Sequence, residues 1–212
     1  MLSADAIVNL QDQGTHNWHR APQDGNHAAP AASGAAPAAE WLEAVARQHR
    51  ANFDLWHIED EARTPGASDA ELAGVKRRVD RANQLRNDLA EALDRRLLGW
   101  LEPQGLPNPK AELHSESPGL IIDRLSILSL KIYHTREEAE RPDAPPGHNA
   151  RNRERLGILE EQRADLAGCL EALWRETLKG TRRFKLYRQL KMYNDPSLNP
   201  AIYRKLSRQT GE

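Results

Sequence analysis

The sequence predicts an all-α fold, a single-domain bundle of about five to seven helices around a buried central helix at 118–140. Three observations support this prediction. Apolar residues recur every three or four positions through most of the chain, which is the period of an amphipathic helix. No segment alternates apolar and polar residues as a half-buried strand does. Proline and glycine gather at a few points, where they would end helices.

The first 38 residues divide into a short helix and an insertion. The N-terminal unit at 1–19 contains a predicted helix at 3–13, with Ser3 as its N-cap. Residues 20–38 are rich in Ala, Pro and Gly and contain no large apolar side chain. Such a composition cannot bury enough surface to offset the entropy of ordering. We therefore expect a flexible insertion there, which packs against nothing.

A helical bundle domain is expected at 39–208, followed by a tail at 209–212. Its first helix is predicted at 39–63, and a Thr-Pro-Gly turn follows it. Ser68 and Glu71 have the spacing of a capping box, which starts the next helix. Further helices are predicted at 68–101, 118–140, 149–179, 181–193 and 198–208.

The central helix carries charged side chains although it is apolar around most of its circumference. On a helical wheel Asp123, Arg124, Lys131 and His134 fall within a sector of roughly 100°. Buried charges need partners, because an unpaired buried charge costs several kcal/mol or is neutralised. The sequence therefore predicts a polar site inside the helical core, with Asp123 and Arg124 buried in it.

Two other predicted helices have apolar seams that an arginine interrupts halfway. Arg86 interrupts one seam, with Asn83 and Asn87 beside it, and Arg163 interrupts the other. Each arginine can lay its aliphatic stem along the core and place its head in water. Alternatively, Arg86 can present a fork of N–H donors to a carboxylate or a bound phosphate.

The segment at 52–63 brings an aromatic residue among polar ones, since Asn52, Trp56, Glu59 and Arg63 share one helical face. This face can be a solvated surface with a Glu59–Arg63 pair four residues apart. A tryptophan among charged residues is better explained as the wall of a cleft.

A metal site has only weak support in the sequence. His57 lies three residues before Asp60 and four before Glu61, a spacing that can place two ligands on one helical face. His114 and His134 would have to converge on it from elsewhere in the fold, so we expect no metal site. The sequence also contains no glycine-rich phosphate loop and no nucleophile elbow, and it identifies no cofactor.

Composition limits the class of partner and the compartment. The formal net charge of −1 argues against nucleic-acid binding. No stretch approaches the ~18 apolar residues of a membrane span. Cys169 is the only cysteine, so no intramolecular disulfide can form, and we expect a reducing, cytoplasmic compartment.

Three segments resemble the bacterial domain of unknown function 4254 family: NFDLWHIEDEAR at 52–63, SPGLIIDRLSILSLKIYHT at 117–135 and YRQLKMYNDPSLNP at 187–200. With the helices between them they cover about residues 41–205. The family has no assigned reaction, so the resemblance implies no catalytic residue. Its members are often encoded near envelope-polysaccharide and glycosyltransferase genes, which implies a cellular context.

Two functional hypotheses are open at this point. In the first, the bundle holds a site for an anionic small molecule, such as a phosphorylated sugar or a nucleotide sugar, and is an enzyme of envelope-glycan biosynthesis. In the second, the chain is a non-catalytic helical module that binds a glycosyltransferase-type protein, and its buried charges fix helix register. An open cleft lined by the polar residues would favour the first, and charges that close on each other would favour the second. Both leave room for a homo-oligomer.

The first hypothesis assigns roles to the polar residues. Asp123 or Glu59 would act as general base or orient a hydroxyl group. His134 or His57 would transfer protons, because histidine titrates near neutral pH. The expected ligand-binding residues are Arg86, Arg124, Lys131, Asn52, Trp56 and Asn83, in which the cationic side chains hold the anion and Trp56 forms a wall.

Overall fold

The computed structural model describes residues 3–20, 37–190 and 197–200. Over these residues the fold is all-α, as predicted, with five α-helices and almost no strand. Most of the predicted insertion at 20–38, most of the predicted helix at 198–208 and the tail at 209–212 lie outside the described residues. The elements are α1 (Ala4–Arg20), α2 (Pro37–Glu61), α3 (Asp69–Leu101), η1 (Glu102–Gln104), β1 (Glu112–Leu113), α4 (Pro118–Glu140), α5 (His148–Leu178) and β2 (Arg182–Arg183).

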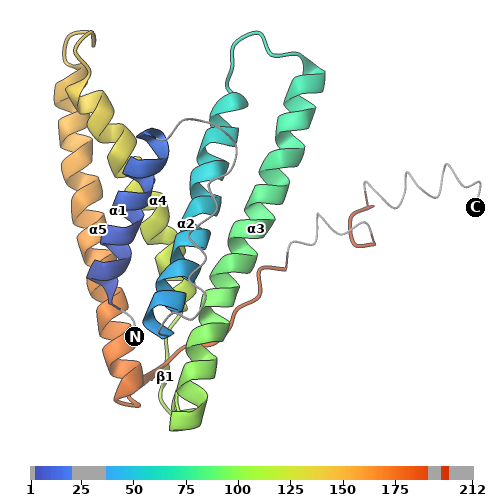
Figure 1. Ribbon diagram of the computed structural model, residues 1–212, viewed down its shortest axis with the longest axis vertical. Coiled ribbons are helices and arrows are strands. Elements are labelled where there is room, and N and C mark those ends of the chain that lie inside the picture. Colours follow the sequence, from blue (N-terminus) through green and yellow to red (C-terminus); the bar gives the residue numbers. More distant parts are fainter. Residues whose placement is uncertain (1–2, 21–36, 191–196, 201–212) are drawn as a thin grey trace, which may run out of the picture.

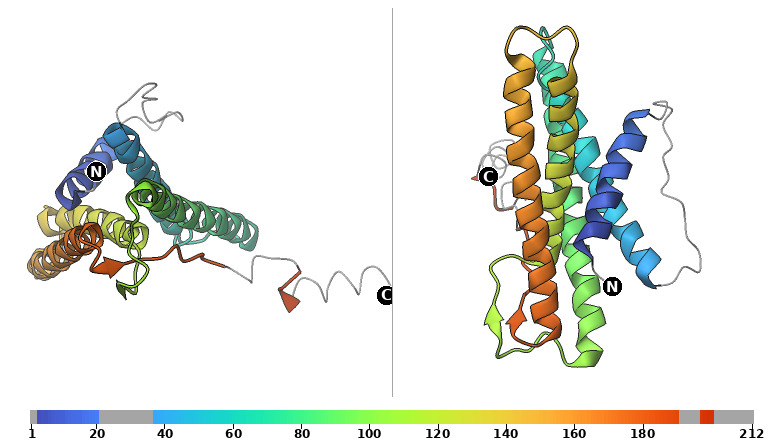
Figure 2. Two further views of the ribbon diagram at one scale, coloured as in Figure 1. Left: turned by 90° about the horizontal axis from the view of Figure 1, so that it is seen from below. Right: turned by 90° about the vertical axis from the view of Figure 1, so that its left-hand side faces the viewer.

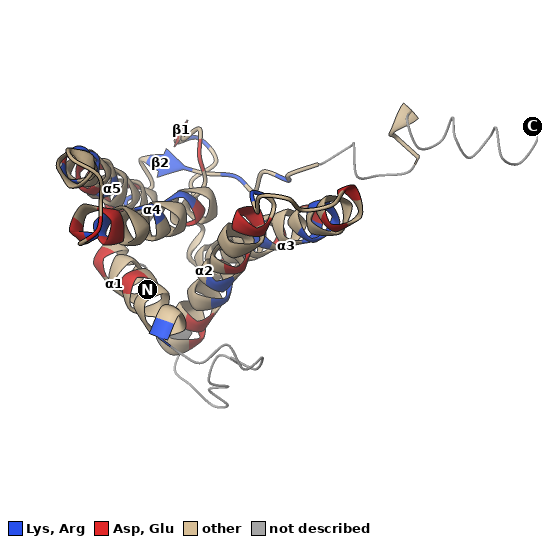
Figure 3. Ribbon diagram, turned by 90° about the horizontal axis from the view of Figure 1, so that it is seen from above, with Lys and Arg blue, Asp and Glu red and all other residues tan. Residues whose placement is uncertain are grey.

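The helices form two long hairpins, α2 with α3 and α4 with α5, which lie side by side (Figure 1). α1 packs on one side of the bundle against both α4 and α2, as the end-on view shows (Figure 2). Each of the five helices carries both acidic and basic residues (Figure 3). None of the helices within the described ranges is long and apolar enough to cross a membrane.

α4 is the central helix, as the sequence predicts. It contacts α1, α2, α3 and α5. Nearly half of its residues are buried, among them Ile122, Leu125 and Leu130. Its buried side chains join those of the other helices in one large apolar core, whose largest members include Trp41, Ile7, Leu93, Leu97, Leu101, Leu170 and Phe184.

The predicted starts of α3 and α4 differ in how they are capped. At α3 the capping box is present, because the Ser68 hydroxyl accepts from the Glu71 amide and Glu71 accepts from the Ser68 amide at 2.7 Å. At α4 the Ser117 side chain caps nothing in its own helix. Instead Asp94 of α3 accepts from the Gly119 amide at 2.7 Å and from the Ser117 hydroxyl. A neighbouring helix therefore supplies the cap.

α1 runs to Arg20, beyond the predicted end at residue 13. The helix continues through Gly14, although glycine has a low helix propensity. In the structure a Cβ at this position would lie 3.2 Å from the His49 ring and 3.3 Å from Trp18. The rings occupy the space that a side chain would need, so tight packing explains a glycine inside the helix.

The predicted helix at 181–193 is wrong over its described part. α5 ends at Leu178, and Gly180, whose φ is 70°, lies in the turn that follows. β2 then pairs in parallel with β1, and the chain continues without helix to residue 190. The Arg183 carbonyl accepts from the His114 amide at 2.8 Å, and Phe184 is buried in the core. Tertiary pairing here overrides local helix propensity.

Candidate functional site

A continuous column of polar side chains lies between α1, α2 and α4. Its lower part is a buried hydrogen-bonded network around Asp123 and His49, and its upper part is a cluster of three histidines. Thr15 of α1 links the two parts, because its side chain contacts His49 and its carbonyl oxygen accepts from His19. All three helices that build the column contribute to both parts.

Asp123 is buried and fully engaged. Its carboxylate accepts from Gln48 Nε2 at 2.6 Å and from Asn52 Nδ2 at 2.9 Å. Arg86 of α3 lies with Nη2 3.3 Å from the same carboxylate. Burial raises the pKa of Asp123 above its ordinary value, while the Arg86 guanidinium and the two amide donors oppose that shift. Asp123 and Arg86 thus close on each other, and neither lines the three concave surfaces described below.

The middle of the column is a chain of hydrogen bonds with a defined direction. Asn52 donates to the Ser126 hydroxyl at 3.0 Å, and Ser126 Oγ lies 2.7 Å from His49 Nδ1. The Thr15 hydroxyl donates to the Gln11 carbonyl oxygen at 2.9 Å. Its oxygen must therefore accept from His49 Nε2, also at 2.9 Å, which leaves His49 Nδ1 to accept from Ser126. Burial lowers the pKa of His49 to about 4, so this histidine is neutral near pH 7.

Three histidines converge at the upper part of the column. His19 comes from α1, His57 from α2 and His134 from α4. One ring nitrogen of each lies within 4.8 Å of the others. The ring centroids of His19 lie 5.1 Å from His57 and 4.9 Å from His134. We call these three residues the histidine cluster.

Two of the clustered rings are held by hydrogen bonds at their outer nitrogen. His19 Nδ1 lies 2.8 Å from the Thr15 carbonyl oxygen, and His134 Nδ1 lies 3.0 Å from a Glu137 carboxylate oxygen. Both partners only accept, so each Nδ1 carries a proton. The Nε2 atoms of His19 and His134 are buried and have no partner among the described residues. Burial and the neighbouring histidines lower the pKa of His57.

Aromatic rings enclose the histidine cluster. Trp56 stacks on His134 with centroids 5.0 Å apart and an interplanar angle of 10°. Tyr133 stacks on His19 at 4.4 Å and 14°. Phe53 meets the edge of His57 at 4.5 Å. These rings fix the orientations of the imidazoles and limit the access of water to them.

A cleft of about 500 Å³ adjoins the histidine cluster between α1 and α4. It shares Tyr133 and Glu137 with the surroundings of the cluster. Its wall is rich in amide, carboxylate and hydroxyl groups, which can bind the hydroxyl groups of a polar ligand. The other lining residues are Asp12, Gln13, Thr15, His16, Asn17, Ser129, Ile132, Arg136 and Glu140.

The structure divides the predicted polar sector of α4 into two faces. Asp123 and His134 face the column, whereas Arg124 and Lys131 are exposed on the side toward α5. Arg124 binds Glu116 at 2.7 Å and 2.9 Å. The prediction that Arg124 is buried with Asp123 is therefore wrong. Arg124 and Lys131 point about 80–100° away from Asp123 on the helical wheel, which is enough to leave the core.

The remaining predicted residues fall in different places. Asn52 and Arg86 join Asp123, and Trp56 and His57 join His134.

Glu59 instead pairs with Arg63 at 3.2 Å on a partly exposed surface. Asn83 is half-buried on α3, and no hydrogen bond within the described ranges joins it to the column. Arg163 binds Asp12 of α1 with two contacts of 2.8 Å, so its head does not simply extend into water.

Sequence reasoning did not identify His19, Thr15, His49, Gln48 or Ser126. The main reason is that the predicted first helix ended at residue 13, so α1 offered no residue to the site. Once the helix continues through Gly14, Thr15 and His19 are four residues apart and share a face. His49 and Asn52 are three residues apart in the same way, a signal that was present in the sequence.

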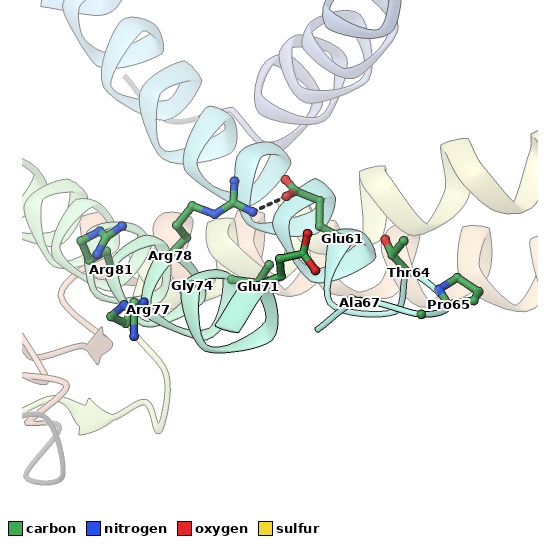
Figure 4. Close-up of a pocket in the computed structure, with 11 residues that line it drawn as sticks. Glu61, Thr64, Pro65, Ala67, Glu71, Gly74, Arg77, Arg78 and Arg81 are labelled. Carbon is green, nitrogen blue, oxygen red and sulfur yellow. Dashed lines mark hydrogen bonds and ion pairs between the residues drawn. The ribbon is translucent and has the colours of Figure 1, made fainter. Parts of the chain in front are cut away.

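A second concave surface lies at the end of the α2–α3 hairpin and has a volume of about 700 Å³. Arg77, Arg78 and Arg81 line it, together with Glu61 and Glu71. Arg78 points toward Glu61 and forms an ion pair with it (Figure 4). This surface is exposed and shares no residue with the polar column, so we do not place the site there.

The sequence was compared with protein families, curated proteins and solved structures. The profile of a family described as "Protein of unknown function (DUF4254)" matches residues 42–186. This match includes most of α2 and all of α3 to α5, and therefore most of the polar column, but it leaves out α1 with Thr15 and His19. The search of curated proteins found no match. The search of solved structures found none either.

Proposed function

The chain belongs to the DUF4254 family of proteins of unknown function, and from its site we propose that it binds an anionic small molecule beside the histidine cluster. The proposed ligand is a phosphorylated sugar or a nucleotide sugar. Under this proposal the protein is an enzyme of envelope-glycan biosynthesis, a context that the resemblance to this family suggests.

The observation that carries the proposal is the pair of unpartnered nitrogens in the histidine cluster. The Nε2 atoms of His19 and His134 are buried without a hydrogen-bond partner in the described part of the chain. A buried polar atom left unsatisfied costs about 1–3 kcal/mol. Because each Nε2 carries a lone pair, these two atoms can accept from hydroxyl groups of a sugar ligand.

The adjoining cleft favours a sugar as the rest of the ligand. Its volume of about 500 Å³ falls within the range of small-molecule sites. Asn17 and Gln13 offer amide groups to sugar hydroxyls, and Tyr133 offers a ring face for a sugar or a base. Arg136 is a cationic lining residue of the same cleft, where it also pairs with Glu160 at 2.8 Å, and carboxylates line this cleft as well: Asp12, Glu137 and Glu140. His57 and His134 remain the proposed proton-transfer residues for a reaction at the phosphorylated end.

The buried network is assigned a supporting role in this proposal. Asp123 is closed off by Arg86, Asn52 and Gln48, so we no longer place a catalytic base there. Through Ser126 and His49 the network instead holds α1, α2 and α4 in register beneath the histidine cluster.

A thermal-shift experiment tests the proposal. Sugar phosphates and nucleotide sugars are compared with neutral sugars and with inorganic phosphate. At a hundredfold excess over Kd, binding stabilises the fold by about 2.7 kcal/mol, which raises Tm by about 5–10 °C for a chain of this size. Asn17→Ala should remove most of this rise. Asn9→Ala, an equally exposed asparagine on α1 outside this cleft, is the matched control.

The same experiment contains the outcome that contradicts the proposal. If no phosphorylated sugar or sugar nucleotide shifts Tm more than inorganic phosphate does, the cleft is not their binding site. An equal loss of response in the Asn17 and Asn9 variants would point to binding elsewhere on α1.

One observation favours the alternative, a non-catalytic module that binds a glycosyltransferase-type protein. Arg124 and Lys131 lie with Ile127 and Leu128 along an open groove of about 760 Å³ between α4 and α5. Co-purification of such a partner with the wild-type chain, and its loss from the Lys131→Glu variant, would support this function. A Tm that no sugar ligand changes would support it further.

A further inference from the structure

We propose that His19, His57 and His134 bind one divalent transition-metal ion, with Zn²⁺ as the best fit, between α1, α2 and α4. The site uses the same histidines as the proposed function, and His57 and His134 would not transfer protons while they hold an ion. Metal binding itself does not require that the sugar ligand be correct. Each histidine comes from a different helix, so one ion would join three elements of the bundle.

The distances within the histidine cluster suit a metal ion. The three ring nitrogens lie within 4.8 Å of one another. Tetrahedral Zn²⁺ with Zn–N bonds of about 2.0–2.1 Å holds its nitrogens about 3.4 Å apart. Each ring therefore needs to move inward by less than about 1 Å, which a small side-chain rotation provides.

The outer hydrogen bonds have the pattern that metal-binding histidines show. A metal-bound histidine nearly always donates its other N–H to a carbonyl or a carboxylate, which fixes the tautomer and the ring orientation. His19 does so to the Thr15 carbonyl at 2.8 Å, and His134 does so to Glu137 at 3.0 Å. The remaining nitrogen of each, Nε2, is buried, carries a lone pair and has no other described partner.

The ligand set indicates the kind of metal and the kind of site. Three imidazoles suit Zn²⁺, Co²⁺, Ni²⁺ or Cu²⁺, whereas Mg²⁺ and Ca²⁺ prefer oxygen ligands. Three protein ligands with a fourth position open to water or substrate are typical of catalytic zinc sites. The stacked rings of Trp56 and Tyr133 shield two of the histidines from solvent.

The charge balance connects the metal to an anionic ligand, and this step rests on the proposed function. Three neutral imidazoles add no negative charge, so a bound divalent ion keeps its full charge of +2. The open position would then attract a negatively charged oxygen, such as one on the phosphate of a sugar ligand. No arginine belongs to the histidine cluster. The charge of the ion would therefore be what attracts an anion to this site.

The test measures metal binding in the absence of any sugar. The full chain is stripped with EDTA, dialysed and titrated with Zn²⁺ in a calorimeter and with Co²⁺ in a visible-absorption assay. We expect one ion to bind per chain. The visible absorption spectrum of bound Co²⁺ should be that of an ion with nitrogen ligands and a low coordination number. His57→Gln and His134→Gln should abolish stoichiometric binding. Glu137→Gln should weaken it about 10-fold, because a neutral amide oxygen replaces the carboxylate that accepts from His134 Nδ1 and raises the basicity of its ring.

Matched controls separate the histidine cluster from ordinary surface histidines. His148→Gln changes a histidine of α5 outside both the cluster and the cleft, with a side chain about as exposed as that of His134, and this variant should bind Zn²⁺ like the wild type. Circular dichroism of each stripped variant verifies folding. Where a cluster variant fails to fold, the Glu137→Gln titration still decides the question. The proposal is overturned if the folded wild type binds no stoichiometric Zn²⁺. It is also overturned if the folded His57→Gln and His134→Gln variants bind Zn²⁺ as well as the wild type does.

Combining the titration with the thermal-shift experiment distinguishes the two failures. Zn²⁺ binding without any Tm response to sugar ligands supports the metal site and contradicts the proposed function. A sugar-phosphate response that persists in EDTA and in the His134→Gln variant, in a chain that binds no Zn²⁺, contradicts the metal site and leaves the proposed function in place.

Discussion

Asp94 makes the stability of this bundle depend on pH in a direction opposite to that of most carboxylates. The side chain is buried between α3 and α4, where it accepts from the Gly119 amide and the Ser117 hydroxyl. Burial raises its pKa from 3.8 to about 6, although the two hydrogen bonds oppose the rise. Asp94→Asn keeps the shape and one acceptor oxygen but removes the titration.

The magnitude follows from the shift. Between pH 3.8 and pH 6 the folded protein binds more protons at Asp94 than the unfolded chain does, so its contribution to stability falls as pH rises through this window. A shift of this size corresponds to about 3 kcal/mol at 1.36 kcal/mol per unit, as an order of magnitude. Below about pH 4 both states are protonated, and above about pH 6 the loss is complete.

Urea unfolding at pH 4.5 and at pH 7.5 measures the effect. We expect the stability of Asp94→Asn relative to wild type to increase by about 1–3 kcal/mol between these two pH values. Asp88→Asn, at an exposed position on the same helix, is the control for the loss of one carboxylate. Parallel pH dependences of wild type and Asp94→Asn would refute the reasoning, because Asp94 would then titrate normally in the folded state.

Two further predictions test the buried network and the helix contact. Asp123→Asn should destabilise the fold by about 3 kcal/mol, because it leaves Arg86 without its buried countercharge. Arg124→Leu should cost less than about 1 kcal/mol, because its ion pair is exposed. Equal losses in urea unfolding would contradict the assignment of Asp123 to the buried face of α4 and of Arg124 to the exposed face. Gly119→Ala should destabilise by about 1–3 kcal/mol, because its Cβ would overlap the Ala90 carbonyl oxygen and lie 2.9 Å from Asp94. Gly99→Ala, with open space around its Cβ, should instead stabilise α3 by about 0.5–1 kcal/mol, and a gain at both glycines would show that backbone propensity rather than contact decides.

Most of the helical architecture could be predicted from the sequence, because its signals are local. The capping box at Ser68 and Glu71 lies within four residues, and the proline at the start of α4 acts on its own turn. The apolar circumference of the 118–140 segment likewise predicted that this helix is central. Such features depend on neighbours along the chain, so periodicity and composition are sufficient to find them.

Half of the candidate site could be predicted for the same reason, and the other half could not. Asn52, Trp56, His57, Asp123 and His134 were identified from spacing on their own helices. His19 was missed because α1 was predicted to stop before Gly14, and only the rings of His49 and Trp18 explain why the helix continues. The predicted burial of Arg124 beside Asp123 was wrong for the same reason. A helical wheel gives the angle between two side chains, but it does not show which face a neighbouring helix covers.

The sequence by itself therefore determined the all-α class, the central helix and the presence of buried polar groups. The tertiary structure alone decided which of these groups meet: the three histidines of α1, α2 and α4, the cap that Asp94 provides across helices, and the β1–β2 pairing at the end of the bundle. The physical reason is that each of these contacts joins residues far apart in the chain. Their meeting depends on how helices cross and pack, which local periodicity does not encode.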